Sequence, residues 1–166
     1  MFRTITFIAI VVWLIVAWEA CGDTISGITK KVYDGDTYSL CTPDGNIMIR
    51  LSFIDAPELK QTFGQQSKEF LSELIEYKSV NVITSKKDKY NRYLGITYRD
   101  STNVNYTMIE KGMAWWYQEF SPNDTSLKRL QQDAQKNKKG LWSETQPLQP
   151  WVFRTIQYRD SIAKKK

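Results

Sequence analysis

Carboxylates and arginines that could carry out hydrolysis are concentrated between residues 36 and 92. Asp36 lies in the run DGDT, Arg50, Asp55 and Glu58 lie in the run RLSFIDAPE, and Arg92 ends the run DKYNR. If Asp36 and Asp55 lie close in space, they can hold a hard divalent cation, because the cation offsets their mutual repulsion. Glu58 could deprotonate a water molecule, and Arg50 and Arg92 could clamp a phosphate while negative charge builds up on it. Together these residue types indicate hydrolysis of a phosphodiester.

Each of these motifs also has a simpler structural interpretation when it is taken alone. An Asp-Gly-Asp-Thr run is commonly just a turn, and Asp55-Ala-Pro-Glu58 is commonly a strand exit followed by a helix cap. Arg92 alone reads as a solvated surface residue. Arg50 is harder to explain in this way, because a guanidinium in an apolar strand is tolerated only when it is paired.

The composition excludes several other kinds of chemistry. The chain of 166 residues contains no histidine, which excludes catalysis by imidazole and metal sites that use histidine ligands. Its two cysteines, Cys21 and Cys41, are too few for a disulfide scaffold or a four-ligand zinc site. The last sixteen residues hold five basic side chains and one aspartate, so most of the net charge of +5 lies in this tail. Such a tail favours anionic partners, although it is equally typical of a solubilising terminus.

The N-terminal 22 residues are typical of a targeting segment. A short basic start precedes an uncharged, largely apolar run over residues 4–18. This run is shorter than the roughly 20 residues of a spanning helix and suits a signal peptide that is cleaved before Asp23. We therefore expect export, either secreted or periplasmic. The alternative is an uncleaved segment that attaches the protein to the membrane through residues 4–18.

From Asp23 onward the pattern predicts strands, one helix, and more strands. Short β-type runs cover residues 24–32, 37–40 and 47–54, with turns at Asp34-Gly35 and Asp44-Gly45. We expect Asp34-Gly35 to turn through a positive φ. Apolar residues at three- to four-residue spacing predict a helix over 65–77, and two more strands follow at 79–84 and 93–98. This order is that of an OB-fold, so we predict an α+β protein that is mainly a five-stranded barrel.

Two further helices are expected after the last strand, which makes three in all. The first carries Val104, Met108 and Ile109 on one face and can end at Gly112, and the second carries Leu127 and Ala134. Gly140 fits a left-handed position after the second of these helices. We place one folded domain over residues 23–154 and a basic tail over 155–166. The proline-interrupted segment beyond Trp142 should drape over the surface, and we expect a monomer.

Six short motifs, in order, give this chain a specific resemblance. They are VYDGDT (32–37), IRLSFIDAPE (49–58), QTFG (61–64), DKYNR (88–92), GMA (112–114) and GLW (140–142). In this order they resemble the successive signatures of the staphylococcal, or micrococcal, nuclease family. The resemblance covers about residues 26–154. It implies an OB-fold barrel and a calcium-dependent endonuclease that cleaves DNA and RNA to leave 3′-phosphate and 5′-hydroxyl ends.

The resemblance also implies a role for individual residues. The carboxylates of Asp36 and Asp55 and the main-chain carbonyl of Ala56 match the family's calcium ligands. Glu58 matches the general base, and Arg50 and Arg92 match the arginines that bind the phosphate and stabilise the transition state. Lys89 and Tyr90 match positions that contact the substrate.

The chain departs from the family pattern at a few positions. Ala56 stands where a threonine is found in the family, which keeps the carbonyl and removes a hydroxyl. Asn91 replaces the usual glycine before Arg92, and asparagine tolerates a left-handed turn. No tyrosine pair stands at the expected offset, so Trp116, Tyr117 or Phe120 would have to stack a base unless they pack in the core.

A second class of function is compatible with the same fold. An OB-fold can bind single-stranded nucleic acid without catalysis, through a basic groove and aromatic platforms. The joint presence of Asp36, Arg50, Asp55, Glu58 and Arg92 favours the enzyme, because a module that only binds has no physical need of them.

Overall fold

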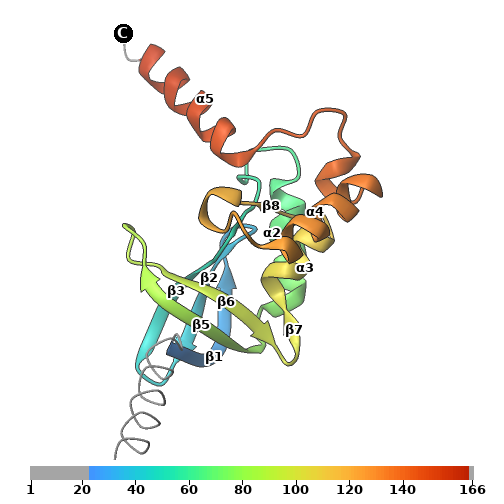
Figure 1. Cartoon of the computed structure of the whole chain (residues 1–166). Helices are drawn as coiled ribbons and strands as arrows, with labels where there is room; N and C mark the ends of the chain where they lie inside the picture. The colour runs from blue at the N-terminus through green and yellow to red at the C-terminus, as the bar shows by residue number, and fades with distance from the viewer. Residues whose placement is uncertain (1–22, 165–166) are drawn as a thin grey trace, which may run out of the picture.

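The computed structural model describes residues 23–164 and contains a closed five-stranded barrel. Its strands are β1 (Asp23–Val32), β2 (Thr37–Thr42), β3 (Gly45–Leu51), β5 (Ser79–Lys87) and β6 (Tyr93–Arg99). Neighbouring strands pair antiparallel in the order β3-β2-β1-β5-β6. The parallel pairing of β3 with β6 closes the barrel (Figure 1). The predicted α+β OB-fold barrel is therefore confirmed.

Three helices lie beside the barrel, as the apolar spacing predicts. They are α2 (Gly64–Ile75), α3 (Val104–Glu110) and α4 (Thr125–Lys136). Leu71 and Ile75 of α2 and Met108 of α3 are fully buried in the core that fills the barrel. Burial of each such side chain stabilises the fold by about 1.5–3 kcal/mol. The helices and the barrel therefore share one core, on which the surface loops are mounted.

The predicted strand over residues 47–54 is in fact broken. β3 ends at Leu51, Phe53 adopts a φ of 65°, and the chain resumes as the two-residue strand β4 (Ile54–Asp55). β4 pairs with β8 (Trp115–Trp116) instead of continuing along the barrel. The remaining short elements are β7 (Thr102–Asn103) and the 3₁₀ turns η1 (Gln118–Phe120) and η2 (Gly140–Ser143). The bend at Phe53 takes Asp55 out of the barrel wall.

The expectation of a positive φ at Asp34-Gly35 is wrong, although Gly45, Gly112 and Gly140 do have positive φ. Gly35 is needed for space instead. A Cβ atom built on it would lie 2.6 Å from Cβ of Ala56 and 2.8 Å from Cβ of Ser67. The loop between β1 and β2 therefore packs directly against α2 and the chain that follows β4.

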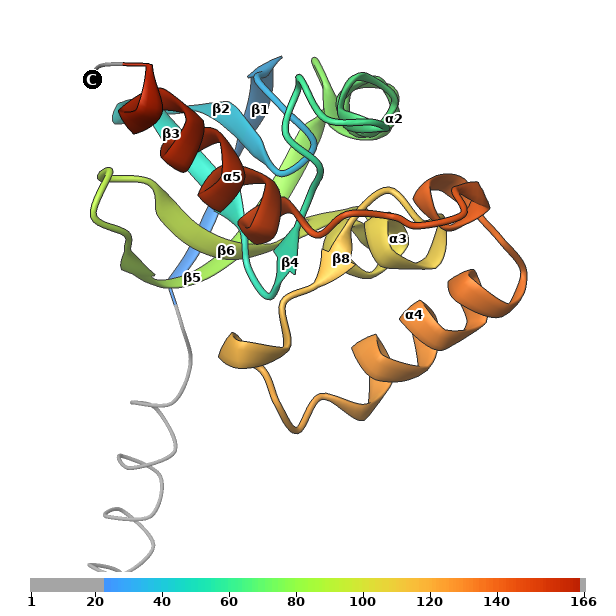
Figure 2. The same cartoon turned by 90° about the horizontal axis from the view of Figure 1, so that it is seen from above.

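The segment beyond Trp142 differs from the expected irregular tail. Residues Pro150–Ala163 form a fourth described helix, α5, which projects away from the barrel in Figure 1 and overlies β3 when seen from above in Figure 2. Pro150 at the start of α5 is favourable, because the first turn of a helix does not need its amide proton. The tail predicted over 155–166 is thus mostly helical. Residues 1–22, with the predicted signal or anchor, lie outside the described residues.

No helix within residues 23–164 is both long enough and apolar enough to cross a membrane.

Candidate active site

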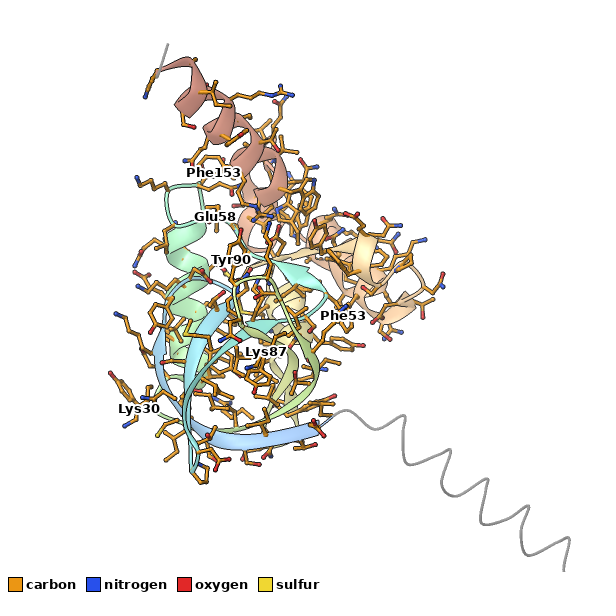
Figure 3. The ribbon with its side chains drawn as sticks, turned by 90° about the vertical axis from the view of Figure 1, so that its left-hand side faces the viewer. Lys30, Phe53, Glu58, Lys87, Tyr90 and Phe153 are labelled. Carbon is orange, nitrogen blue, oxygen red and sulfur yellow. The ribbon has the colours of Figure 1, made fainter. Side chains whose placement is uncertain are left out.

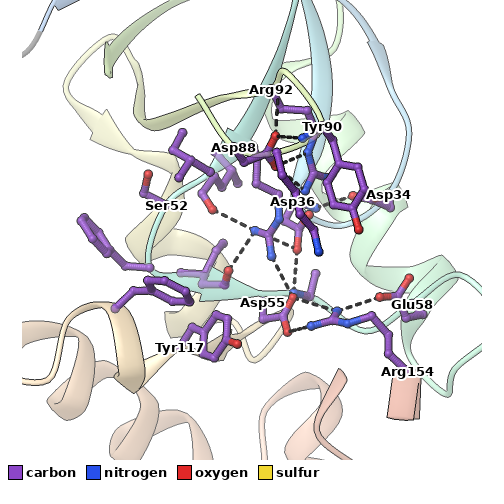
Figure 4. A pocket seen from close by; sticks show the side chains of 18 of the residues that line it. Asp34, Asp36, Ser52, Asp55, Glu58, Asp88, Tyr90, Arg92, Tyr117 and Arg154 are labelled. Carbon is purple, nitrogen blue, oxygen red and sulfur yellow. Dashed lines mark hydrogen bonds and ion pairs between the residues drawn. The ribbon is translucent and has the colours of Figure 1, made fainter. Parts of the chain in front are cut away.

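A pocket of about 670 Å³ lies beside the open end of the barrel, where several loops meet α5 (Figure 4). Its walls come from the β1–β2 loop, the chain from Arg50 to Glu58, the β5–β6 loop, the segment after β8, and α5. In the side view, Glu58 and Tyr90 lie on the side of the barrel that faces α5, and Lys30 lies far from them (Figure 3). The charged side chains in the lining are Asp34, Asp36, Arg50, Asp55, Glu58, Lys86, Asp88, Lys89, Arg92 and Arg154.

The tight loop between β1 and β2 places Asp36. The amide of Asp36 donates a hydrogen bond to Oδ1 of Asp34 at 3.0 Å, which closes the turn locally. Oδ2 of Asp36 accepts from the amide of Ala56 at 2.9 Å, and Oδ1 accepts from the hydroxyl of Thr37 at 3.0 Å. Asp36 is thereby fixed against the chain that follows β4.

Arg50 bridges the two aspartates. Its Nη1 lies 3.1 Å from Oδ2 of Asp36, and its Nη2 lies 2.8 Å from Oδ1 of Asp55. Nη1 also donates to the main-chain oxygens of Leu51 and Ile54, each at 2.9 Å. These carbonyls flank the bend at Phe53, so the bend and the guanidinium hold each other in place. The pairing that the sequence demands for Arg50 is thus satisfied by the two predicted metal carboxylates.

Arg92 is placed by the β5–β6 loop. Asn91 has a φ of 65°, which confirms that asparagine supports a left-handed turn at this position. Oδ1 of Asp88 accepts from the amides of Tyr90 and Arg92, and Oδ2 accepts from Nε of Arg92 at 2.8 Å. Nη1 of Arg92 then donates to the hydroxyl of Thr37 at 3.1 Å. Through Thr37 the arginine reaches the loop that carries Asp36.

Asp88 is a positioning residue for Arg92, and Asp88→Asn should lower kcat by about tenfold with little change in KM. The reason is that an amide has only one oxygen. It therefore cannot accept the main-chain hydrogen bonds of the loop and the hydrogen bond from the guanidinium at the same time. Steady-state cleavage kinetics of Asp88→Asn and Asp88→Glu measure the effect, and Asp88→Glu should recover part of the lost rate. Equal rates for the wild type and Asp88→Asn would contradict this role.

Asp88 should also affect how the stability of the protein depends on pH in acid. Burial opposes ionisation of Asp88, but hydrogen bonds from Arg92 and Tyr90 prevail and lower its pKa. A lowered pKa contributes stability that is present above the ordinary value near 4 and is lost as the pH falls through the lowered value. The free energy of unfolding of the wild type should therefore fall more steeply with acid than that of Asp88→Asn.

Glu58 follows Asp55 by three residues and lies at the rim of the pocket. Its carboxylate is partly exposed and pairs with a residue from the far end of the chain, Arg154 of α5. Nη1 of Arg154 lies 2.8 Å from Oε1 of Glu58, and Nη2 lies 2.8 Å from Oδ2 of Asp55. Hydrogen bonds and ion pairs thus run without a break from Arg92 through Thr37, Asp36, Arg50 and Asp55 to Glu58, the last step through Arg154 (Figure 4).

Burial dominates the electrostatics of Asp34 and Asp55. It raises the pKa of Asp55 despite the hydrogen bonds from Arg154, and the nearby Asp36 raises it further. Burial, together with the charge of Asp36, also raises the pKa of Asp34 to about 7. A positive charge placed beside carboxylates crowded in this way stabilises their ionised form.

The donor set fits a hard divalent cation. Asp36 and Asp55 share one guanidinium, and the main chain of Ala56 lies against Asp36. The carboxylate oxygens of the two aspartates are ligands of the kind that calcium prefers, whereas the contact of Ala56 with Asp36 is made by its amide. Among residues 23–164 no three acidic or cysteine side chains form a metal cluster, so main-chain oxygen and water would have to complete the coordination.

The structure brings the predicted site residues together. Asp36, Arg50, Asp55, Ala56, Glu58 and Arg92 all line the pocket, as do Lys89 and Tyr90. Of the three candidate aromatics, Tyr117 and Phe120 also line it, whereas Trp116 is buried and donates from Nε1 to Ser121.

Two residues of the pocket, Asp34 and Arg154, were not predicted from the sequence. Asp34 belongs to the DGDT run that holds Asp36, so its position was available, but the burial that perturbs it was not. Arg154 was counted only as one charge of the basic tail, and no local signal points to its place in the pocket.

Matches to known proteins agree with this geometry. The family model described as "Staphylococcal nuclease homologue" matches residues 48–144. The chain is 38% identical over 144 residues to an "Uncharacterized endonuclease" of Escherichia coli O157:H7, which covers 86% of this chain and 94% of that protein. It is 33% identical over 157 residues to a "Micrococcal nuclease" of Shigella flexneri, which covers 89% of this chain and 90% of that protein. A plant protein, "Probable staphylococcal-like nuclease CAN1" of Oryza sativa, is 37% identical over 106 residues, which are 64% of this chain and 32% of that protein.

Proposed function

The chain belongs to the staphylococcal nuclease homologue family and is a nuclease, and from this premise we propose a calcium-dependent endonuclease that cleaves both DNA and RNA. The observation that carries the proposal is the single pocket in which two buried aspartates, a partly exposed glutamate and two arginines meet. The proposed products carry 3′-phosphate and 5′-hydroxyl ends, as in the family that the motifs resemble.

The charge of the pocket supports a metal cofactor. Five acidic and five basic side chains line it, so the acidic groups offset much of the attraction that the basic groups have for a phosphate. Asp36 and Asp55, with the carbonyl of Ala56, are the proposed calcium ligands. When bound, a calcium ion would supply the missing positive charge and stabilise the charge that develops on the phosphate.

Glu58, Arg50 and Arg92 have different proposed roles in the reaction. Glu58, which is more exposed than Asp36 and Asp55, is proposed to accept a proton from the attacking water. Arg50 and Arg92 are proposed to donate to the phosphate oxygens, where charge-assisted hydrogen bonds are strongest as the transition state forms. Both arginines are anchored by acids or main-chain oxygens, which fixes their direction before the substrate arrives.

Lys89 and Tyr90 are the proposed contacts for the rest of the substrate. Nζ of Lys89 lies 5.1 Å from the centre of the Tyr90 ring, and the guanidinium carbon of Arg92 lies 5.4 Å from the same ring. A largely exposed aromatic ring close to two cations is suited to stack a base while the cations meet phosphates. Tyr117 and Phe120 offer a second aromatic surface across the pocket. A module that only binds would not need the buried carboxylates, so we favour the enzyme.

Substrate and metal preference can be tested together. The full chain is incubated with closed circular single-stranded DNA, duplex DNA and RNA, with calcium, with magnesium, or with a chelator. We expect calcium to support cleavage of all three substrates and the chelator to abolish it. Equal cleavage in the chelator would refute the calcium dependence, and binding of single strands without cleavage would favour the binding module.

We also propose that the protein is exported as a monomer, by way of residues 1–22. Cleavage before Asp23 would remove none of the described residues of β1, Asp23–Val32. N-terminal sequencing of the protein from the producing cell separates a cleaved signal from an anchor. An intact N-terminus in a membrane fraction would favour attachment through residues 4–18.

A further inference from the structure

We propose that Arg154 takes the place of the metal cation at Asp55 and Glu58 when the site is empty, and is displaced from them when the cation binds. Metal binding and the docking of α5 would then compete for the same carboxylates. This inference rests on the proposed calcium dependence.

Several hydrogen-bond donors surround the carboxylate of Asp55. This side chain is 1% exposed, so its oxygens depend on protein partners. Oδ2 accepts from Nη2 of Arg154 at 2.8 Å, while Oδ1 accepts from Nη1 of Arg154 at 3.2 Å and from Nη2 of Arg50 at 2.8 Å. Both oxygens are therefore taken by guanidinium groups. A cation that uses Asp55 as a ligand would therefore compete with these donors for the same buried oxygens.

Of the two arginines that bind Asp55, Arg154 is the easier to displace. Arg50 lies on strand β3, is 14% exposed, and is also bonded to two main-chain oxygens. Arg154 is 44% exposed, and its guanidinium makes hydrogen bonds only to Asp55 and Glu58 within the described chain. Arg154 can exchange these bonds for water at lower cost than Arg50 can. It is also repelled by any cation bound between the carboxylates.

Apart from this contact, α5 is only weakly attached to the rest of the protein. Pro150 is the only buried residue of the helix, and Trp151 stacks on Tyr117 with ring centres 5.2 Å apart. After Arg154, the apolar side chains Ile156, Tyr158 and Ile162 are 44%, 68% and 41% exposed. The ion pairs of Arg154 are thus a main restraint on the body of the helix. Releasing them would free α5 while Trp151 keeps its start in place.

Displacement would also uncover the proposed base. Nη1 of Arg154 donates a hydrogen bond to Oε1 of Glu58 at 2.8 Å. This oxygen of the proposed base is therefore already hydrogen-bonded. Removing the guanidinium leaves this oxygen free for water. The metal would in this way unmask Glu58 in the same step in which it binds.

Calcium titration by calorimetry on the full chain tests the competition without measuring activity. Arg154→Gln should bind calcium about tenfold more tightly than the wild type, since coupling between two ligands of one site is typically 5- to 150-fold. Arg159→Gln is the matched control, because it removes the same charge from an exposed position further along α5. Its affinity should stay within about twofold of the wild type, as expected of a distant surface charge.

A second measurement follows the helix itself. In the wild type, calcium should increase amide hydrogen exchange in α5 after Arg154, whereas in Arg154→Gln the exchange should be high with or without calcium. Arg154→Lys keeps the charge but loses the paired donors, and should lie between the two in calcium affinity.

The outcomes separate this inference from the proposed function. If the wild type binds calcium and Arg154→Gln binds it no more tightly than Arg159→Gln, the competition is refuted and the calcium site stands. If the wild type binds no calcium, both are refuted. Unchanged exchange in α5 on calcium binding also overturns the displacement.

Discussion

Replacing Glu58 with glutamine should lower the rate of strand cleavage by about 10²- to 10⁴-fold, the usual contribution of general base catalysis. The amide keeps the shape of the side chain and can still accept a hydrogen bond from Arg154, so the pocket should stay intact. It cannot take a proton from water. Single-turnover cleavage at saturating calcium measures the loss, and binding of a single-stranded DNA in the chelator should be unchanged.

The control for Glu58→Gln is Glu69→Gln, the same change at an exposed position on α2 that lies outside the pocket lining. This variant should cleave at the wild-type rate. If Glu58→Gln also cleaves at a near-normal rate, Glu58 is not the base, and water must be activated in another way.

Replacing Arg92 with alanine should cost about 2.7–4 kcal/mol of transition-state stabilisation, or roughly 10²- to 10³-fold in kcat. Arg92 is 25% exposed, is fixed by Asp88, and reaches Thr37 beside Asp36, so its direction is set before the substrate binds. A donor held in this way contributes most when charge develops on the phosphate. The loss should therefore fall on kcat more than on KM.

Arg129→Ala on α4 provides the comparison for Arg92→Ala. It removes an arginine that is exposed and outside the pocket lining. Its kinetics should match the wild type. A loss of less than tenfold for Arg92→Ala would return Arg92 to the interpretation of a surface residue.

Much of the site was predictable because its parts lie in local motifs. The turn that holds Asp36, the run from Arg50 to Glu58 and the loop that ends at Arg92 each have their own sequence pattern. The spacing of apolar residues predicts the strands and helices of an OB-fold barrel. In that fold these segments lie at one end of the barrel. The positive φ of Asn91 was predictable for the same reason, since it depends on a single residue within a short turn.

What the sequence did not reveal depends on contacts between distant segments. Arg154 and Glu58 are 96 residues apart in the sequence. The position of Arg154 depends on the path of the chain between η2 and α5. Gly35 was assigned to the right turn for the wrong reason, because the constraint is the approach of Ala56 and Ser67 rather than φ. The raised pKa of Asp34 likewise follows from burial, which no local pattern encodes.

The bend at Phe53 shows how a local pattern can also mislead. The apolar run 47–54 has the composition of one strand, yet Arg50 bonds the carbonyls of Leu51 and Ile54 on either side of the bend. Continuing the strand would keep Asp55 in the barrel wall. Breaking it turns Asp55 toward Arg50 and Asp36, which builds the pocket.

The most direct test of the account examines the ends of the products. The full chain is incubated with a closed circular single-stranded DNA in calcium, in a chelator, and in the chelator after calcium is restored, and the new ends are identified. We predict fragments with 3′-phosphate and 5′-hydroxyl ends in calcium, none in the chelator, and recovery when calcium returns. Cleavage that continues in the chelator, or that leaves 5′-phosphates, would contradict the assignment of this pocket as a calcium-dependent nuclease site.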